Sequence, residues 1–313
     1  MKSFRIPILV VFSILLLACG RDQLSHWQSL QSQASELAES QQYAEATEVA
    51  EEAVVLAEEI FGPDHPSLAA SLTNLALILV NQGQLGRAED LYVRALSIAE
   101  NNFDPQHAFV STVRNNLARF YRHQGRHQAA QPLYEEAISV AEDTFGVGQP
   151  EILPGLYNLA ENFLLQGEFG LAEDHLFRAL EIQENAVGLG HPETAATLNK
   201  LGELYRTAGM YEDAELVHFR ALDAVEAELG PDDVGILETL YKLGELLRTL
   251  QRYDKAEVYY LRAQRILESA YAADDPIMVP FLEQMGALLT ELGREEEARK
   301  LINRAVEISQ ANP

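Results

Sequence analysis

The sequence predicts an all-α fold, a right-handed superhelical solenoid of about seven helix-turn-helix hairpins. The first observation is a small residue that returns every 42 residues without an insertion or deletion. The second is a set of apolar residues at three-to-four spacing, the period of one buried helix face. The third is a glycine that recurs between two helical stretches and is typical of a helix end. A fixed period of this size indicates a repeat array.

Three ladders of small residues set the register of the copies, because small side chains let two helix backbones approach closely. The first is Ala46, Ala88, Ala130, Ala172, Ala214, Ala256 and Ala298. The second is Ala53, Ala95, Ala137, Ala179, Ala221, Ala263 and Ala305. The third is Ala34, Ala76, Ala118, Ala160, Gly202, Gly244 and Gly286. The predicted solenoid spans 23–313, with repeats at about 23–64, 65–106, 107–148, 149–190, 191–232, 233–274 and 275–313.

The copy over 191–232 illustrates how one hairpin is built. Pro192 opens the first helix, where a missing N–H costs nothing. Gly209 ends this helix, and the second helix runs over about 211–229. The apolar face of the first helix is formed by Leu198, Leu201 and Tyr205. The histidines that precede the first helices are interpreted as loop or capping residues; they are His65, His107 and His191.

The order LNKLGELY, then G-x-Y-x-x-A, then RAL resembles the tetratricopeptide repeat (TPR). The 42-residue spacing and the His-Pro start resemble the long-repeat subtype found in kinesin light chains. The resemblance covers about 23–310 and implies a solenoid that binds protein segments. The alternative is a HEAT or armadillo array, whose period of about 40–47 residues also fits. The small-residue ladders favour TPR units, and the proline and arginine pattern of HEAT units is not evident.

One copy departs from the pattern at Arg114. The corresponding residues in the other well-formed copies are Leu72, Leu156, Leu198 and Leu240. A long basic side chain can pack its stem on apolar surface while its charged head stays in water. We therefore expect the stem of Arg114 to pack and its guanidinium to reach solvent.

The first 18 residues have the pattern of a secretory signal peptide, 1–18. Lys2 and Arg5 precede an apolar run over 6–18, which is shorter than the roughly 20 residues of a spanning helix. The run LLACG at 16–20 resembles the lipobox of bacterial lipoproteins. The alternative is an unmodified cysteine in an ordinary signal peptide or signal anchor.

The lipobox resemblance implies a cut before Cys19, a diacylglycerol group on its sulfur and a lipidated N-terminus at 19–22. Two or more acyl chains, palmitate among them, anchor a protein firmly to a membrane. An aspartate directly after the cysteine favours inner-membrane retention in enterobacterial lipoproteins, but Asp22 comes two residues too late. We therefore predict a bacterial cell-envelope protein anchored to the outer membrane and facing the periplasm. In a source without an outer membrane, the anchor would be the cytoplasmic membrane.

The composition argues against several classes of function. The formal net charge of −25 disfavours nucleic acid, whose phosphates require lysine and arginine. A single cysteine excludes an intrachain disulfide framework. No phosphate loop, nucleophile elbow or metalloprotease motif is present, so we predict no enzyme activity, cofactor, metal or small-molecule substrate. His123 and His127 have chelating spacing, but His127 takes a structural position of the repeat.

The candidate binding site is the polar face of the first helices, opposite their apolar face. By resemblance to TPR solenoids, this face lines a concave groove where asparagines hold a ligand backbone. Its cations would attract an acidic segment or a C-terminal carboxylate. The alternative is a mixed solvated face, because Glu161, Glu203 and Glu245 share it. The candidate residues are Asn74, Asn115, Asn116, Arg119, Arg122, Tyr157, Asn158, Asn199, Lys200, Arg206, Tyr241, Lys242 and Arg248.

Three hypotheses for function follow from these features. The first is a membrane-anchored TPR scaffold or adaptor that binds a protein or peptide partner through its concave groove. The second is a pilotin-like structural factor for an envelope machine, such as a secretion system, a pilus or outer-membrane protein assembly. That factor would act through the convex face or the end caps. The third is a hydrolase that uses carboxylates of the groove, although no sequence motif supports this hypothesis.

Overall fold

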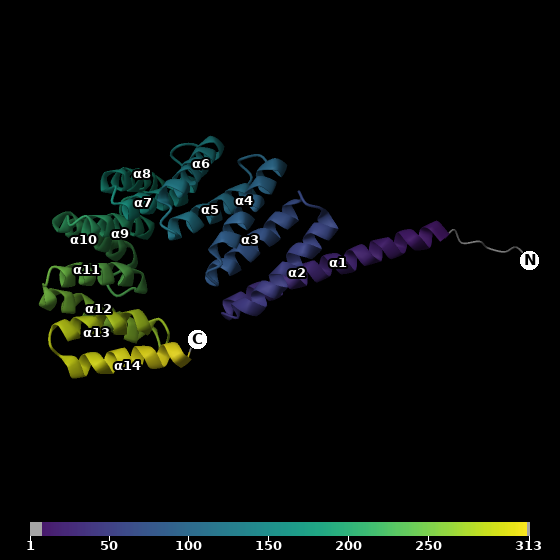
Figure 1. The fold of residues 1–313 in the computed structure, drawn as a ribbon. Helices are drawn as coiled ribbons and strands as arrows, with labels where there is room; N and C mark the ends of the chain where they lie inside the picture. Colours follow the sequence, from purple (N-terminus) through teal and green to yellow (C-terminus); the bar gives the residue numbers. More distant parts are fainter. Residues whose placement is uncertain (1–7, 312–313) are drawn as a thin grey trace, which may run out of the picture. The chain divides into compact units, whose positions relative to one another are not determined.

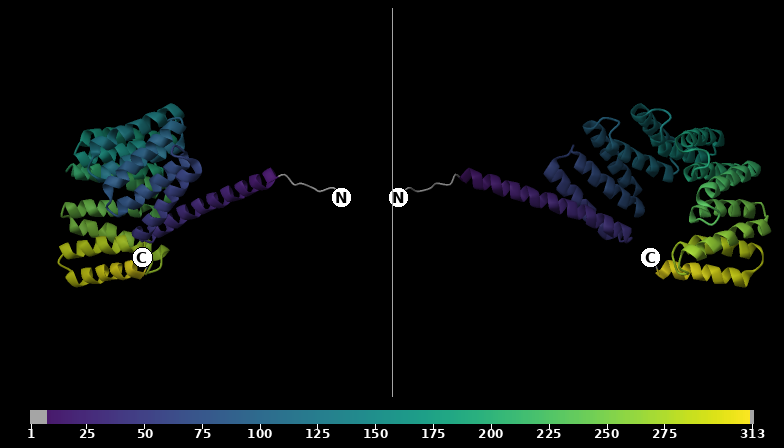
Figure 2. Two further views of the ribbon diagram at one scale, coloured as in Figure 1. Left: turned by 45° about the vertical axis from the view of Figure 1, so that its right-hand side comes forward. Right: turned by 180° about the vertical axis from the view of Figure 1, so that it is seen from behind.

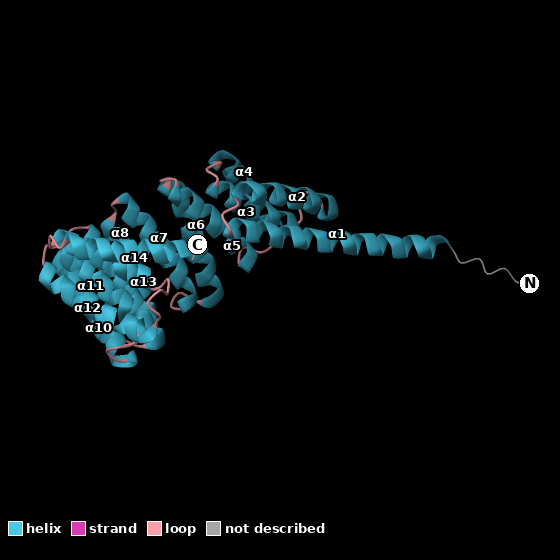
Figure 3. Cartoon of the chain, turned by 90° about the horizontal axis from the view of Figure 1, so that it is seen from below, coloured by secondary structure: helices cyan, strands magenta, loops and turns pink. Residues whose placement is uncertain are grey.

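The computed structural model describes residues 8–311, with side chains described from residue 22 onward. The described part contains only helices and short connections, with no strand (Figure 3). It is an α-solenoid of tandem helical hairpins, which confirms the predicted fold class. The predicted signal peptide and the Cys19 side chain lie outside the part whose side chains are described. Within the described residues, no helix combines the length and the apolar character needed to cross a membrane.

The chain divides into two compact units, 1–144 and 145–313. Unit 1 contains α1 Ile8–Glu39, α2 Tyr43–Phe61, α3 Pro66–Asn81, α4 Leu85–Asn102, α5 Ala108–His123 and α6 His127–Phe145, whose last residue belongs to unit 2. Unit 2 contains η1 Pro150–Ile152, α7 Leu153–Gln166, α8 Phe169–Val187, α9 Pro192–Thr207, α10 Tyr211–Leu229, η2 Val234–Ile236, α11 Leu237–Thr249, α12 Tyr253–Ala270, α13 Met278–Glu291 and α14 Glu295–Ala311. Within each unit the helices follow one another in chain order (Figures 1 and 2).

The small-residue ladders lie in the core, as predicted, except that Ala137 of the second ladder is half-buried. Every alanine of the first ladder is at most 2% exposed. In the third ladder, Gly202, Gly244 and Gly286 each face a side chain of the second helix of their own hairpin. A Cβ atom at Gly202 would lie 2.4 Å from the imidazole of His218, and one at Gly244 would lie 2.5 Å from the ring of Tyr260. Glycine at these positions therefore makes room for a large residue on the partner helix.

The hairpin turns share one backbone conformation. The glycine that ends each first helix has a left-handed φ, such as +76° at Gly209. Gln41 and Gln251 replace this glycine in two copies and hold nearly the same conformation, with φ of 59° and 56°. A side chain rarely adopts this region, so the turn geometry is imposed by the packing of the two helices.

The histidines before the first helices are N-caps, which confirms their interpretation as capping residues. The Nδ1 atoms of His65, His107 and His191 accept hydrogen bonds of 3.1–3.3 Å from the backbone N–H two residues later. Asp233 and Asp275 cap the next two repeats in the same way through Oδ1. An imidazole nitrogen can accept only while it is unprotonated, so these three caps require neutral histidines.

In several hairpins an ion pair connects the second helix to the second helix of the preceding hairpin. Arg94 on α4 lies 2.6 Å from Glu58 on α2. In unit 2 the equivalent pairs are Arg220 with Glu184 and Arg262 with Glu226. The sequence has the glutamate of this pair in six copies, at 58, 100, 142, 184, 226 and 268. Among the hairpins that follow another hairpin, the third is the exception, because it has Glu136 where the others have arginine; the first hairpin has Glu52 there.

Arg114 compensates for this exception, and the expectation that its guanidinium reaches solvent was wrong. The Arg114 side chain is 1% exposed. Its Nη2 lies 2.9 Å from Glu100 on α4 and 3.0 Å from Glu136 on α6. Without this cation two carboxylates would face each other, because Glu136 stands in the arginine position beside Glu100. The buried arginine thus replaces both a core leucine and the missing member of the ion pair.

This arrangement predicts an asymmetric response to substitution. Glu100→Gln combined with Glu136→Gln leaves Arg114 buried without a counter-charge, which should lower the free energy of unfolding by about 3 kcal/mol. Adding Arg114→Leu restores the residue of the other copies, so most of the loss should be recovered. Urea unfolding followed by circular dichroism measures both. A triple variant no more stable than the double variant would contradict the compensation.

Candidate functional site

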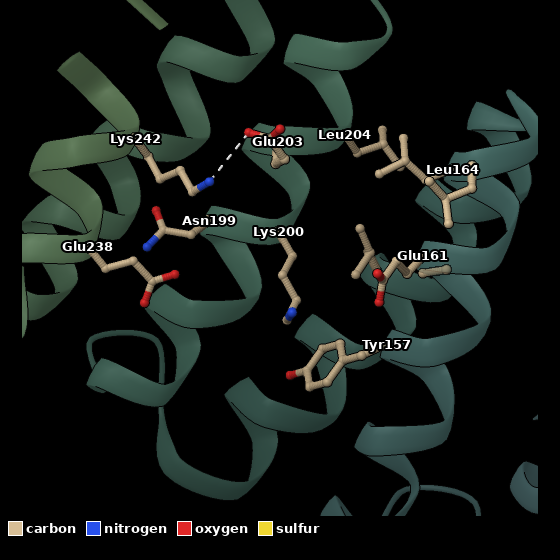
Figure 4. A pocket seen from close by; sticks show the side chains of 12 residues that line it. Tyr157, Glu161, Leu164, Asn199, Lys200, Glu203, Leu204, Glu238 and Lys242 are labelled. Atoms are coloured by element: carbon tan, nitrogen blue, oxygen red, sulfur yellow. Dashed lines mark ion pairs between the residues drawn. The ribbon is translucent and has the colours of Figure 1, made fainter. Parts of the chain in front are cut away.

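A pocket of about 330 Å³ opens on the first-helix face of unit 2. Figure 4 shows its side chains, which come mainly from α7, α9 and α11. The face is the predicted one, because these are the first helices of three successive hairpins. The lining residues are Tyr157, Ala160, Glu161, Leu164, Leu165, Leu176, Asn199, Lys200, Glu203, Leu204, Glu238 and Lys242.

One part of the pocket lining is apolar. Leu164 and Leu165 come from the end of α7, and Leu204 comes from α9. Leu165 is 56% exposed although it lies on a helix with a buried face. Ala160 and Leu176 complete the apolar lining. A pocket with an apolar lining and a few polar groups is the usual form of a binding site.

Lys200 is the lysine at the centre of the pocket (Figure 4). Its Nζ lies 5.2 Å from the ring centroid of Tyr157, within the range of a cation–π interaction. The Tyr157 hydroxyl lies 2.6 Å from Oγ1 of Thr197 on α9, which holds the ring in place. Burial raises the pKa of Tyr157, so the phenol stays neutral. Within the described residues Lys200 has no carboxylate at ion-pair distance, which leaves its charge available to a ligand.

Lys242 differs from Lys200 because it belongs to a charge network between α9 and α11. Its Nζ lies 3.6 Å from Glu203 and 4.0 Å from Glu245. The Nη2 atom of Arg206 donates a hydrogen bond to Oε1 of Glu203 at 2.5 Å and lies 3.7 Å from Oε1 of Glu245. Burial acts to raise the pKa of Glu203, but the hydrogen bond from Arg206 and the charges of Lys242 and Arg206 hold it below its usual value. Lys242 and Arg206 therefore serve the packing of two repeats.

Asn199 borders the pocket, but its amide is occupied inside the unit. Its Nδ2 donates to Oγ1 of Thr239 on α11 at 2.9 Å. Its Oδ1 therefore faces Nδ1 of His218 as an acceptor, at 3.1 Å. The side chain is only 3% exposed. We expect Asn199 to position α9 against α10 and α11 rather than to hold a ligand backbone.

His218 is fully buried on α10, against the backbone at Gly202. Since Nδ1 donates to Asn199, Nε2 is the unprotonated nitrogen, and it is buried without a hydrogen-bond partner. Burial lowers the pKa of His218 to about 4, and the nearby charge of Lys242 acts in the same direction. The imidazole is therefore neutral at physiological pH, and a proton on it would be a buried charge.

The lowered pKa predicts that unit 2 loses stability in mild acid. The unfolded chain binds a proton near pH 6.5 and the folded chain only near pH 4. The contribution of neutral His218 to the free energy of unfolding is therefore complete above pH 6.5. As the pH drops toward 4, the free energy of unfolding falls by roughly 3 kcal/mol. His218→Ile should remove this part of the pH dependence, because Ile302 already fits against Gly286 at the same position. Urea midpoints for both proteins between pH 4 and 7 test this; parallel profiles would contradict it.

The predicted binding residues of unit 1 differ from one another in burial and in hydrogen bonding. Nδ2 of Asn74 donates to Gln31 at 3.0 Å, a link from α3 to α1. Asn115 is half-buried and its amide oxygen has no hydrogen-bond partner. Asn116 is half-buried, whereas Arg119 is exposed. Arg122 is 8% exposed, so most of its surface is inside the unit.

In unit 2, the pocket brings together Tyr157, Asn199, Lys200 and Lys242 from the predicted set. Asn158, Arg206, Tyr241 and Arg248 lie outside its lining. Arg248 reaches Glu291 on α13 at 3.5 Å, and burial raises the pKa of Tyr241 to about 12.

The predicted set of binding residues did not include Glu238 or the leucines that line the pocket. The signal for the leucines was present, because Leu164 stands where Arg122, Arg206 and Arg248 stand in other copies.

The lining is mixed in charge rather than cationic. Two lysines share it with Glu161, Glu203 and Glu238. Within the described residues, no group of three or more histidine, cysteine, aspartate or glutamate side chains is placed to hold a metal ion. The arrangement offers a central cation on an aromatic ring beside an apolar surface. This arrangement suits the binding of a chain segment that carries both a negative and an apolar group.

Tandem hairpins with a pocket on their first helices define a helical repeat protein. The family model described as tetratricopeptide repeat matches residues 33–101, 71–143, 109–185, 151–227 and 218–269, and a second model with the same description matches 279–312. The chain therefore belongs to the tetratricopeptide repeat family. This finding decides against the HEAT or armadillo alternative. No curated protein matches the chain.

Solved structures share the fold at low sequence identity. A putative kinesin light chain from Podosopora anserina with nearly identical TPR-like repeats is 23% identical, with a TM-score of 0.59 over 64% of this chain and 96% of that one. BtubC (BKLC) from P. vanneervenii is 24% identical, with a TM-score of 0.53 over 79% of this chain and 93% of that one. A tetratricopeptide repeat protein from Parabacteroides merdae is 17% identical, with a TM-score of 0.57 over 91% and 93%.

Proposed function

We propose that this chain is a lipid-anchored, non-enzymatic scaffold of the bacterial cell envelope that binds a segment of a partner protein. The pocket over α7, α9 and α11 is the proposed binding site. The observation that carries the proposal is Lys200, an exposed cation on the Tyr157 ring that no carboxylate of unit 2 neutralises. TPR proteins in general bind protein partners, which agrees with this role.

The chemistry of the pocket sets what the bound segment must contain. A carboxylate, either an acidic side chain or a C-terminus, would pair with Lys200. An apolar side chain next to it would fill the space beside Leu164, Leu165 and Leu204. Glu161 and Glu238 would repel a segment with several negative charges. The proposed partner segment is therefore apolar with one negative group, rather than uniformly acidic.

The anchor rests on the sequence around Cys19. The lipobox resemblance supports a lipid on this cysteine. Gly20, rather than an aspartate, follows the cysteine, which leaves the outer membrane as the default destination, with the solenoid facing the periplasm. A tether of this kind would hold the pocket within a short distance of the membrane and raise the effective concentration of partners there.

Lys200→Glu should abolish partner recovery without unfolding the protein. The side chain is exposed and makes no ion pair in the described chain, so the substitution reverses the pocket charge at little structural cost. Lys242→Glu is less suitable, because it also breaks the network with Glu203. Quantitative pull-down from envelope extracts measures recovery. Lys300→Glu, an equal charge change at an exposed position of α14, is the matched control. Equal recovery by both variants would count against the pocket.

Cys19→Ala should release the protein from the membrane fraction or leave it as an uncut precursor. The native protein should carry the mass of a cleaved, acylated chain, because the lipid requires the thiol. Membrane fractionation and mass spectrometry of the intact protein distinguish these forms. A native chain that keeps residues 1–18 and carries no lipid would favour the signal-anchor alternative.

A further inference from the structure

An apolar ridge crosses the second helices of unit 2, away from the pocket-lining first helices. It consists of five exposed side chains, Phe177, Leu216, Phe219, Val258 and Leu261. Their exposed fractions range from 37% at Phe219 to 68% at Leu216. Phe177, Phe219 and Leu261 occupy one position of the repeat, and Leu216 and Val258 share another. Large apolar side chains gathered on a surface indicate an interaction site.

Contacts between the helices make the ridge one surface. Arg220 on α10 pairs with Glu184 on α8, and Arg262 on α12 pairs with Glu226 on α10. The rings of Phe219 and Tyr259 lie 6.4 Å apart across α10 and α12. The helices α8, α10 and α12 also lie in sequence in the ribbon (Figure 1). The five side chains are therefore held at fixed spacing across three successive repeats.

The charges around the ridge are predominantly negative. Two arginines beside it, Arg220 and Arg262, are already neutralised by glutamates of the preceding repeat. Several exposed carboxylates on the same helices have no ion pair within the described chain; those within one helical turn of a ridge residue include Asp174, Glu181, Glu212, Asp223 and Asp254. Exposed cations that remain beside them are Lys255 and Arg265, both on α12. The ridge is thus an apolar strip with an acidic border.

We propose that this ridge binds a cationic amphipathic helix of a partner protein. The apolar side of such a helix would cover Phe177, Phe219 and Leu261, and its lysines or arginines would meet the border carboxylates. A second copy of this chain is a poor occupant, because two acidic borders would face each other. An anionic lipid surface is repelled for the same reason. None of the five ridge side chains lines the pocket, and of the pocket-lining residues only Leu176 belongs to a ridge helix, so the proposal does not depend on the pocket.

A binding titration tests the apolar part of the proposal. The full chain is placed in nanodiscs of zwitterionic lipid and titrated against a fluorescent helix of leucine and lysine, about five turns long. Anisotropy should report binding that weakens by about tenfold or more in Leu216→Ser/Phe219→Ser. Val55→Ser is the matched control, since Val55 is an exposed apolar residue of α2. Unchanged affinity in the ridge variant, or no binding by the native chain, would overturn the proposal.

A second titration tests the border. Asp223→Asn with Glu181→Gln should weaken binding and flatten its dependence on salt concentration, because these charges are exposed and screened by salt. A helix with glutamate in place of lysine should bind at least tenfold more weakly to the native chain. If the leucine–glutamate helix binds equally well, charge plays no part and the proposed partner class is wrong.

Photo-cross-linking identifies the occupant directly. Phe219→p-benzoylphenylalanine keeps an aromatic side chain and should cross-link to the cationic helix, whereas the same substitution at Val55 should not. Cross-links mainly to a second copy of the chain, or mainly to lipid, would overturn the proposal in favour of self-association or membrane contact. Circular dichroism of each variant confirms that the helices remain folded.

Discussion

Close approach of the two helices in each hairpin is the constraint on which the rest of the structure depends. The alanines of the first ladder have almost no exposed surface, and a single added carbon at Gly202 or Gly244 would overlap the partner helix. This contact fixes the angle at which each hairpin leaves its turn. The left-handed turn persists at Gln41 and Gln251 despite its cost to a side chain, because the packing of the two helices leaves no other path.

Most of the fold could be predicted from the sequence because its determinants recur. Ladders, turn glycines and capping residues each appear several times at the same spacing, so a single exception does not hide the pattern. Arg114 could not be interpreted in this way. Its role depends on Glu100 and Glu136, which are significant only when one knows that these positions lie together across two hairpins. The period can be recognised from the sequence alone, but a contact between two repeats cannot be recognised from the sequence of either repeat.

The candidate site was predicted in position but not in detail. The resemblance to TPR solenoids pointed to the first-helix face, and the repeat register placed Lys200 on it; the pocket lies on this face and Lys200 lines it. Periodicity could not reveal that Asn199 is turned toward Thr239 and His218, because the direction of a side chain depends on hydrogen-bond partners in neighbouring helices. It also treated the face as polar throughout. Leu164 and Leu165 make part of it apolar, which changes the chemistry expected of a bound segment.

The charge cluster of Arg114, Glu100 and Glu136 has a consequence for how a repeat array can evolve. Arg114 and Glu136 belong to the same hairpin, and the glutamate supplied by the preceding hairpin is common to six copies. A duplication or loss of whole 42-residue units would therefore keep the two unusual residues together and still provide their partner. The third hairpin can differ chemically from its siblings and remain interchangeable with them, so the array is free to diversify one unit at a time.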